Sequence, residues 1–380
     1  MHIDSKLPDV GTTIFTVMSK MAAECGAINL SQGFPDFDTH PELIERVNHY
    51  MRKGFNQYAP MQGVPELRRR IAEKILRSYG ARVDPETEIT VTSGATEAVF
   101  AAVTAVVRPG DEVILLEPAY DAYEPAVRLN QGVPVHIPLR FPGYRIDWRQ
   151  LSSKLSGRTR LVILNSPHNP TGTVLDEDDI RALRELAARF EFLILSDEVY
   201  EHIIFDGRRH ESMLRHPDLA ARSFVVSSFG KTYHTTGWKV GYCIAPAHLS
   251  AEFRKIRQYV TFCTNTPIQM AYADFLVREE LFTELSGFYQ RKRDLFVQRL
   301  AGARLKPLPC SGTYFVMADY SALGGRDDRQ MAEELTRRHG VAAIPPSCFY
   351  HDGRDHHVLR FCFAKKDETL IQAAEILCRI

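Results

Sequence analysis

Short apolar runs alternate with longer helical patterns through the middle of the chain, and this alternation restricts the possible folds more than any other feature. The helical patterns include residues 96–107 and 177–190. Several of the runs are apolar at successive positions, as in strands buried on both faces of a sheet. The sequence therefore predicts an α/β fold with a mostly parallel, seven-stranded sheet. The seven runs are residues 88–92, 112–116, 133–137, 161–164, 192–195, 224–227 and 240–245.

The C-terminal part of the chain has a different pattern. A long helical stretch at 279–300 precedes strand-like runs at 313–318, 341–344 and 358–363, and a closing helix is expected after Lys366. The 380 residues are enough for two domains. We therefore expect a large domain at 41–278 and a smaller α+β domain at 279–380. Residues 1–40 are assigned to the smaller domain, because they are too few to enclose a core alone.

Composition excludes several classes of partner. The 47 Lys and Arg residues balance 47 Asp and Glu residues, so no basic surface for nucleic acid is indicated. The seven cysteines are irregularly spaced without a C-x-x-C pair, which favours free thiols in a reducing compartment. Residues 1–10 lack the apolar core of a signal peptide, and no apolar run is long enough to span a bilayer. We expect a cytoplasmic protein without a membrane or nucleic-acid partner.

Polar residues follow five of the predicted strands. Ligands of open α/β sheets bind at the carboxyl ends of the strands, so these residues are expected to form one site. In chain order they are the segment Ser93-Gly94-Ala95-Thr96, Tyr120, the pair Asn165 and Asn169, the pair Asp197 and Tyr200, and the pair Ser228 and Lys231.

Lys231 follows the sixth strand, and a second cation, Lys239, comes shortly after it. A lysine in this position could form a Schiff base, and Ser228 with Lys239 could then hold a phosphate. This is the combination that pyridoxal phosphate requires. The backbone N–H groups of Ala95 and Thr96, at the start of a helix after Gly94, would also favour a phosphate. The alternatives are a surface lysine and a simple helix cap.

Asp197 directly follows an apolar strand, where a carboxylate needs a cationic partner or its pKa rises. The protonated pyridine nitrogen of the cofactor would be such a partner, and a helix N-cap is the alternative. Asn169 and Tyr200 could donate to the phenolate oxygen of the cofactor. Tyr120 could stack on its ring. An ordinary turn and a core tyrosine remain the other interpretations of Asn169 and Tyr120.

Arg360 lies inside an apolar strand, where it needs an anion. A substrate carboxylate held by two hydrogen bonds is a natural partner, and a buried structural salt bridge is the alternative. His351, His356 and His357 occupy a charged loop and are interpreted as solvated residues. No metal site is predicted.

Three motifs resemble the class I/II aminotransferases of pyridoxal-phosphate fold type I. They are Asn169-Pro170-Thr171-Gly172, Ser196-Asp197-Glu198-Val199-Tyr200, and Ser228-Phe229-Gly230-Lys231 followed by Gly237-Trp238-Lys239-Val240-Gly241. The match covers nearly the whole chain, and within the family the chain most resembles the kynurenine/glutamine aminotransferase branch. The segments 29–37 and 227–241 are similar to a bacterial member of the family. One departure is Lys239, where the family often has arginine; lysine keeps the charge but loses the planar fork.

The resemblance implies a role for each matching position. Lys231 would be the Schiff-base lysine and proton shuttle, and Asp197 would pair with the pyridine nitrogen. Arg360 would bind the substrate carboxylate, with Gly33, Asn169 and Phe15 nearby. Tyr58 would reach the phosphate of the neighbouring subunit in a homodimer. The remaining cofactor contacts would be Gly94, Ala95, Thr96, Tyr120, Asn169, Tyr200, Ser228 and Lys239.

The implied activity is a ping-pong transfer of an amino group from an L-amino acid to a 2-oxo acid. No second arginine is evident for a dicarboxylic substrate, and Phe15, Tyr58, Tyr120 and His234 indicate an apolar pocket. We expect methionine, phenylalanine, tyrosine, glutamine or kynurenine as the donor. The alternatives are a pyridoxal-phosphate β-lyase acting on C–S bonds and a regulatory module without activity. A nicotinamide-binding domain is disfavoured, because no G-x-G-x-x-G follows the first strand.

Overall fold

The computed structural model describes residues 3–380, and a seven-stranded sheet lies at its centre. The strands have the order β2-β8-β7-β6-β5-β3-β4, and β8 alone runs opposite to the others. The predicted α/β fold with a mostly parallel sheet is confirmed. The strands are β2 (Ile89–Thr92), β3 (Glu112–Glu117), β4 (Val133–Pro138), β5 (Thr159–Asn165), β6 (Leu193–Asp197), β7 (Ser223–Ser228) and β8 (Gly241–Ile244).

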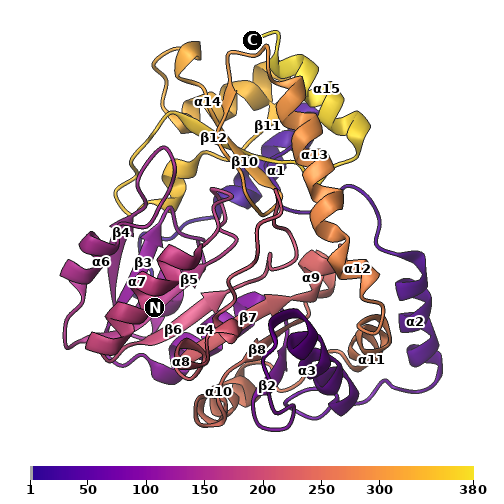
Figure 1. Cartoon of the computed structure of the whole chain (residues 1–380). Coiled ribbons are helices and arrows are strands. Elements are labelled where there is room, and N and C mark those ends of the chain that lie inside the picture. The colour runs from indigo at the N-terminus through magenta and orange to yellow at the C-terminus, as the bar shows by residue number, and fades with distance from the viewer. Residues whose placement is uncertain (1–2) are drawn as a thin grey trace.

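Successive residues of the buried strands pack on opposite faces of this sheet. Ile114 of β3 belongs to one core, and its neighbour Leu115 belongs to another. Helices therefore cover both faces (Figure 1), which explains why these strands are apolar at successive positions. The Ile114 face carries α2 (Pro41–Arg52), α3 (Pro65–Tyr79), α6 (Trp148–Lys154), α7 (Glu177–Arg189), α8 (Pro217–Ala220) and α11 (Thr266–Phe275), and the Leu115 face carries α4 (Ala95–Val106), α5 (Tyr123–Leu129) and α10 (Ala247–Val260).

A second group of elements surrounds a separate core at one end of the sheet. It contains an antiparallel sheet of β9 (Lys306–Pro307), β10 (Phe315–Asp319) and β12 (Val358–Cys362). The helices are α13 (Leu285–Arg299), α14 (Asp328–Glu334) and α15 (Asp367–Leu377). In Figure 1 these orange and yellow elements lie above the central sheet.

The N-terminal residues pack with this second group. Met18 and Met21 of α1 (Ile14–Cys25) lie in the same core as Leu359 of β12. The short strand β1 (Ile28–Asn29) pairs in parallel with β11 (Val341–Ala342). Chain segments from the two ends of the sequence therefore form one packed unit, with α1 in indigo among the orange and yellow elements (Figure 1).

Two expected elements are shorter in the structure. The helical stretch at 279–300 is interrupted at Glu284, between α12 (Glu280–Thr283) and α13. Ser286 and Gly287 lie just after the break, and both are weak helix formers. The Ser286 hydroxyl also donates to the carbonyl oxygen of Ile204, outside the helix. The strand expected at 341–344 ends after two paired residues, because Pro345 and Pro346 follow and cannot donate to a ladder.

Among residues 3–380, no helix is long and apolar enough to cross a membrane. The carboxyl ends of β5, β6 and β7 lie next to β10 and β12, and a cavity is found at this junction.

Candidate active site

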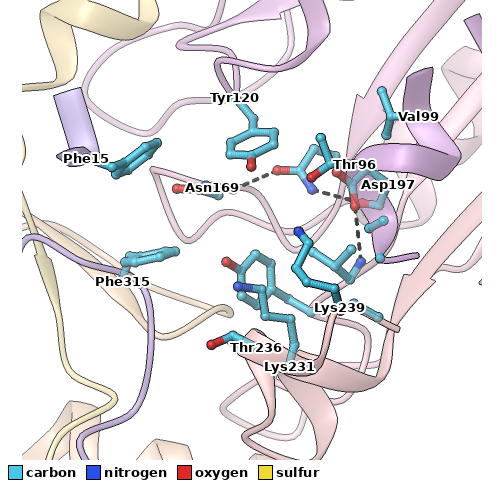
Figure 2. A pocket seen from close by; sticks show the side chains of 18 of the residues that line it. Phe15, Thr96, Val99, Tyr120, Asn169, Asp197, Lys231, Thr236, Lys239 and Phe315 are labelled. Atoms are coloured by element: carbon cyan, nitrogen blue, oxygen red, sulfur yellow. Dashed lines mark hydrogen bonds between the residues drawn. The ribbon is translucent and has the colours of Figure 1, made fainter. Parts of the chain in front are cut away.

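A cavity between the central sheet and the second group of elements contains every predicted site residue except Tyr58 (Figure 2). In Figure 2, Phe15 and Phe315 lie on one side of the cavity, and Thr96 and Asp197 lie on the other. Residues that are far apart in the sequence therefore share one space. The predicted residues in its wall are Phe15, Gly33, Gly94, Ala95, Thr96, Tyr120, Asn169, Asp197, Tyr200, Ser228, Lys231, Lys239 and Arg360.

Lys231 projects from α9 (Phe229–Thr232), a single helical turn that follows β7. Its Nζ donates a hydrogen bond to the Tyr314 hydroxyl at 2.9 Å and lies 5.6 Å from the centre of the Tyr200 ring. Burial lowers the pKa of Lys231 to about 8, and the positive charge of Lys239 acts in the same direction. A neutral amine is thus accessible near neutral pH, as a nucleophile or a proton acceptor requires.

Asp197 is buried at the end of β6 and is 5% exposed. One carboxylate oxygen accepts from the Tyr123 hydroxyl at 2.6 Å, and the other accepts from the Val199 N–H at 3.3 Å. Burial raises the pKa of Asp197 to about 6. Across the described chain no cationic side chain lies within ion-pair distance of this carboxylate. Asp197 therefore fits a cation supplied by a ligand, such as a protonated pyridine nitrogen.

The start of α4 forms an anion-binding corner with Lys239. Gly94 has φ +84° and no side chain caps the helix; a Cβ there would lie 3.3 Å from the Nζ of Lys239. A Cβ on Gly241 would lie 2.6 Å from the carbonyl oxygen of Ser227 and 3.0 Å from the nitrogen of Ala95. Within residues 3–380 no carboxylate pairs with Lys239. The helix dipole, the free N–H groups and the ammonium group together fit a phosphate.

Arg360 is fully buried on β12, in the cavity wall. Its Nη1 donates to Oδ1 of Asn169 at 2.9 Å, its Nη2 donates to the carbonyl oxygen of Ser31 at 2.7 Å, and its Nε has no partner. In the described part of the chain no carboxylate forms an ion pair with Arg360, so the structural salt bridge that sequence left open is absent. A buried guanidinium with a free donor fits a carboxylate from outside.

Three aromatic rings surround the Arg360 guanidinium. Its Cζ lies 3.9 Å from the centre of the Phe315 ring, 5.1 Å from that of Phe15 and 5.9 Å from that of Phe349. Such rings attract a cation and exclude water from it. Arg360 is therefore held in a dry, aromatic environment where its bond to an anion is strengthened.

Asn169 and Asn165 connect Arg360 to Asp197. The backbone N–H of Asn169 donates to Oδ1 of Asn165 at 2.8 Å, and Nδ2 of Asn165 donates to the carbonyl oxygen of Asp197 at 2.9 Å. Oδ1 of Asn169 is occupied by Arg360, and the described residues provide no acceptor for its Nδ2. Asn169 can therefore donate to a ligand with Nδ2.

Two residues expected near the pocket lie elsewhere. Tyr58 is 82% exposed, with its ring 5.4 Å from that of Phe262. His234 does not line the cavity but packs against Phe37, with ring centres 4.9 Å apart, and against Phe288. His234 follows α9 with φ +57°, and its side chain is half-buried against these rings.

Tyr123 and Tyr314 bond to the two central groups of the site, and the sequence did not identify them. Each tyrosine is buried and packs in a hydrophobic core, as a core tyrosine would. In the sequence, only the proximity of Tyr123 to Tyr120 could have indicated a role. Nothing distinguished Tyr314 from Phe315, its neighbour in the strand-like run at 313–318.

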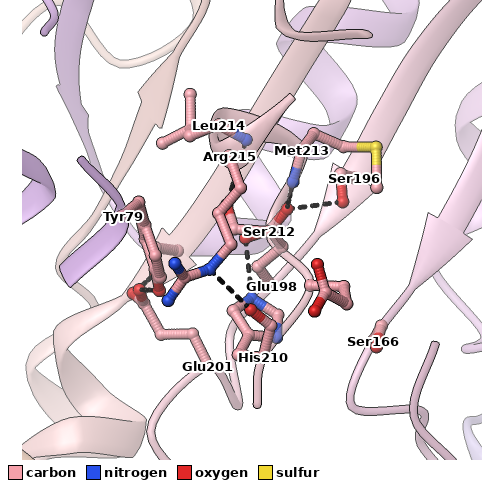
Figure 3. Close-up of polar contacts among 12 residues, drawn as sticks. Tyr79, Ser166, Ser196, Glu198, Glu201, His210, Ser212, Met213, Leu214 and Arg215 are labelled. Atoms are coloured by element: carbon pink, nitrogen blue, oxygen red, sulfur yellow. Dashed lines mark hydrogen bonds and ion pairs between the residues drawn. The ribbon is translucent and has the colours of Figure 1, made fainter. Parts of the chain in front are cut away.

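A buried polar network lies behind the segment that carries Asp197 and Tyr200 (Figure 3). Glu198 accepts from the Met213 N–H at 3.0 Å and lies 2.8 Å from Nε2 of His210. Glu201 lies 2.6 Å from Nζ of Lys74 and also accepts from the hydroxyls of Tyr79, Ser227 and Tyr242. These bonds anchor the segment on the side away from the cavity.

Comparisons with known proteins identify close relatives over the whole chain. The sequence model of the family "Aminotransferase class I and II" matches residues 26–377. The chain is 54% identical over 374 residues to the methionine aminotransferase of Escherichia coli K12, covering 98% of this chain and 97% of the relative. It is 33% identical to human kynurenine–oxoglutarate transaminase 1, covering 94% of this chain and 92% of the relative.

Solved structures have the same fold. The crystal structure of Escherichia coli YbdL, described as having a methionine aminotransferase function, matches with a TM-score of 0.98 and 53% identity over 100% of both chains. The N-succinyldiaminopimelate aminotransferase of Mycobacterium tuberculosis matches with a TM-score of 0.95 and 39% identity over 100% of both chains.

Proposed function

The chain belongs to the class I and II aminotransferases, which are pyridoxal-phosphate-dependent enzymes, and from this premise we propose that it acts on methionine and other apolar or aromatic L-amino acids, with a 2-oxo acid as acceptor. The observation that carries the substrate class is the aromatic environment of Arg360, built by Phe15, Phe315 and Phe349. The described residues of the cavity wall include three cationic side chains. Arg360 lies beside these rings, whereas Lys231 and Lys239 lie on the side proposed for the cofactor. A second carboxylate on the substrate would have no cationic partner there.

Pyridoxal phosphate, when bound, supplies an aldehyde that takes up the amino group and a ring that accepts electrons from the substrate. We propose that Lys239 and the N–H groups of Ala95 and Thr96 bind its phosphate, with Gly94 and Ser228 close by. Asp197 keeps the ring nitrogen charged, because a cation beside it relieves the cost of its own burial. Tyr120 stacks on the ring, and Tyr200 donates to the phenolate oxygen.

The substrate is held and deprotonated by a second set of residues. Arg360 binds the α-carboxylate, with Asn169 and Gly33 beside it, and Phe15 excludes water. Nζ of Lys231 would remove the proton from the α-carbon of the amino-acid donor in the first half-reaction, and would deliver a proton to the α-carbon formed from the 2-oxo acid in the second. Because the pKa of Lys231 is lowered to about 8, a neutral amine is available for this step.

We also propose a homodimer in which Tyr58 contacts the phosphate bound by the neighbouring subunit. The exposure of Tyr58, of Phe262 beside it and of Tyr259 on α10 supports this, since such rings are enriched in interfaces. Residues 41–278 would form the cofactor-binding domain, and residues 1–40 with 279–380 the smaller one, as the separate cores suggest. The seven free cysteines support a cytoplasmic location.

A donor panel tests the substrate class. The purified protein, loaded with pyridoxal phosphate, would be assayed with methionine, phenylalanine, tyrosine, glutamine, kynurenine and aspartate against one 2-oxo acid. We expect kcat/KM for methionine to exceed that for aspartate by at least about a hundredfold, because the side-chain carboxylate of aspartate would be buried without a cationic partner. A preference for aspartate would refute the proposal. Release of pyruvate and a thiol from a cysteine conjugate, without an oxo acid, would instead indicate β-lyase activity.

A further inference from the structure

Glu117 connects the end of β3 to a segment that lies 234 positions later in the chain. Its carboxylate is almost fully buried, at 1% exposure. Oε1 accepts from the backbone N–H of His351 at 2.7 Å, and Oε2 lies 2.9 Å from Nδ1 of the same residue. Nδ1 of His136, on β4, lies 3.0 Å from Oε1. The carboxylate of Glu117, at the end of β3, thus contacts the neighbouring edge strand β4 and the C-terminal segment around His351.

The protonation state of this group follows from its contacts. Burial acts to raise the pKa of Glu117, but the nearby His136 imidazole and the two hydrogen bonds from His351 outweigh it and hold the pKa below its usual value. Glu117 is therefore an ionised acceptor, and the bonds to it are charge-assisted.

The three side chains do not form a metal site in this arrangement. The rings of His136 and His351 are stacked 4.2 Å apart with an angle of 12° between their planes. A metal bound to an imidazole nitrogen lies in the plane of that ring. The planes of these two stacked rings are nearly parallel and separated, so one metal ion cannot lie in both planes close to the two rings. In the stacked pair, His351 hydrogen-bonds to the Glu117 carboxylate, and His136 packs against His351 with Nδ1 near the same carboxylate.

The segment that Glu117 holds reaches the proposed substrate site. Phe349 lies two residues before His351, and its carbonyl oxygen accepts from the N–H of Ala119 at 2.8 Å. Its ring is 5.8 Å from that of Phe15 and 5.9 Å from Cζ of Arg360. The bonds at Glu117 and Ala119 therefore fix one wall of the aromatic environment around Arg360 relative to the cofactor side of the cavity.

We propose that Glu117, acting through His351, is a positioning residue for the carboxylate-binding Arg360; this rests on the proposed function. Without the His351 imidazole, only two backbone hydrogen bonds hold the Phe349 segment to Glu117 and Ala119, so the aromatic wall beside Arg360 becomes more mobile and Arg360 binds carboxylates less tightly. Donor and acceptor both carry the α-carboxylate, so both are affected. Cofactor binding is retained, because Lys231, Asp197 and Lys239 lie on other elements and Tyr120 follows β3, which the change of His351 leaves in place.

The side chain of His351 is 44% exposed, so it can be changed without opening the core. In His351→Ala we expect KM to rise about tenfold for methionine and for the 2-oxo acid, as the loss of a charge-assisted hydrogen bond implies, with kcat and the visible cofactor band retained. In His351→Asn we expect KM within about twofold of wild type, because Nδ2 of asparagine can replace Nδ1 as the donor. His216→Ala is the matched control, since His216 lies 3.2 Å from a buried glutamate, Glu211, outside the cavity.

A binding measurement separates this inference from the proposed function. Calorimetry with 3-phenylpropionate, a carboxylate without an amino group, reports on Arg360 without turnover. We expect about tenfold weaker binding in His351→Ala and wild-type binding in His351→Asn. If wild-type protein transaminates but His351→Ala binds the acid as tightly, the inference is wrong and the proposed function stands. If wild-type protein binds the acid but does not transaminate methionine, the proposed function fails. An equal loss in the asparagine variant, or a loss of cofactor instead, would identify a purely structural role.

Discussion

Nζ of Lys231 donates a hydrogen bond to the hydroxyl of Tyr314 at 2.9 Å, and that hydroxyl donates to the carbonyl oxygen of Gly33 at 2.7 Å. Lys231 follows β7 of the central sheet, whereas Tyr314 precedes β10 and Gly33 follows β1. The proposed proton-transferring amine is thus oriented from across the cavity by the other group of elements. Its position depends on how the two groups pack together.

Replacing Tyr314 by phenylalanine tests this orientation. We expect kcat to fall about tenfold with KM little changed, because a hydrogen bond to a charged or reacting group contributes about 1.5–3 kcal/mol. Steady-state kinetics with methionine would measure the effect. Tyr289→Phe is the matched control: its buried hydroxyl has no partner, and its ring lies 5.7 Å from that of Tyr314. Equal losses in the two variants would contradict a specific role for Tyr314.

The uptake of pyridoxal phosphate by cofactor-free protein is expected to depend on the ionisation of Lys231. Burial lowers the pKa of this amine from 10.5 to about 8, and the neutral form reacts with the aldehyde. The rate of uptake should therefore rise from about pH 6 and level off above about pH 8, as followed by the visible absorbance of the bound cofactor. Lys231→Ala should show no such band and lose at least about a hundredfold in activity. A rate that still rises steeply near pH 10 would contradict the shifted pKa.

Asp197 is expected to destabilise the cofactor-free protein when it is ionised. Burial raises its folded pKa from 3.8 to about 6, so between these values the folded state binds more protons than the unfolded state. The contribution of Asp197 to stability should therefore fall as pH rises from 3.8 to about 6, by about 3 kcal/mol at 1.36 kcal/mol per pKa unit. Urea denaturation would show this as a difference: the unfolding free energy of wild type relative to Asp197→Asn should fall by this amount across that pH range, because all other groups titrate in both proteins. The same variant should bind pyridoxal phosphate at least about a hundredfold more weakly, since its ring nitrogen loses its partner.

The buried pair of Lys74 and Glu201 is expected to stabilise the segment beneath the site. Their charged atoms are 2.6 Å apart, and both side chains are nearly inaccessible. Lys74→Met leaves a buried carboxylate without its cation, so the free energy of unfolding should fall by about 3–5 kcal/mol. The exposed pair of Lys255 and Glu252 provides the control, and Lys255→Met should cost under about 1 kcal/mol. Similar effects of the two substitutions on chemical denaturation would refute the expectation.

Tyr58 tests the proposed homodimer. If its hydroxyl contacts the phosphate in the neighbouring subunit, Tyr58→Phe should weaken pyridoxal phosphate binding about tenfold while the molecule still sediments as a dimer. Tyr259→Phe, which changes another exposed tyrosine nearby, should leave the affinity unchanged. A wild-type protein that sediments as a monomer and retains full cofactor affinity would contradict the shared site.

Local sequence was sufficient for the central sheet and most of the proposed site. Ile114 and Leu115 are apolar in succession because each faces a different helical layer, and this local pattern is enough to predict β3. Asp197 and Lys231 directly follow such strands. Parallel strands bring their carboxyl ends to one edge of a sheet, so the position of these residues along the chain predicted that they would meet.

Contacts between segments that are distant in the chain could not be predicted in the same way. Tyr123 and Tyr314 look like core residues in their own segments, and only the packing of β10 against the sheet brings Tyr314 to Lys231. His351 was interpreted as a solvated loop residue, yet it is bonded to Glu117 and stacked on His136. Nothing in the residues around His351 encodes a partner 234 positions earlier.

Periodicity and residue type act over a few neighbouring residues, so they are enough to specify the strands, their apolar faces and the chemistry at their ends. The groups that support that chemistry depend on how distant elements pack together. Lys231 has its hydrogen bond to Tyr314 because the two cores pack against each other, whereas the aromatic rings around Arg360 come together within the second core. Hydrogen bonds depend on distances of about 3 Å, and the relative placement of distant elements sets such distances.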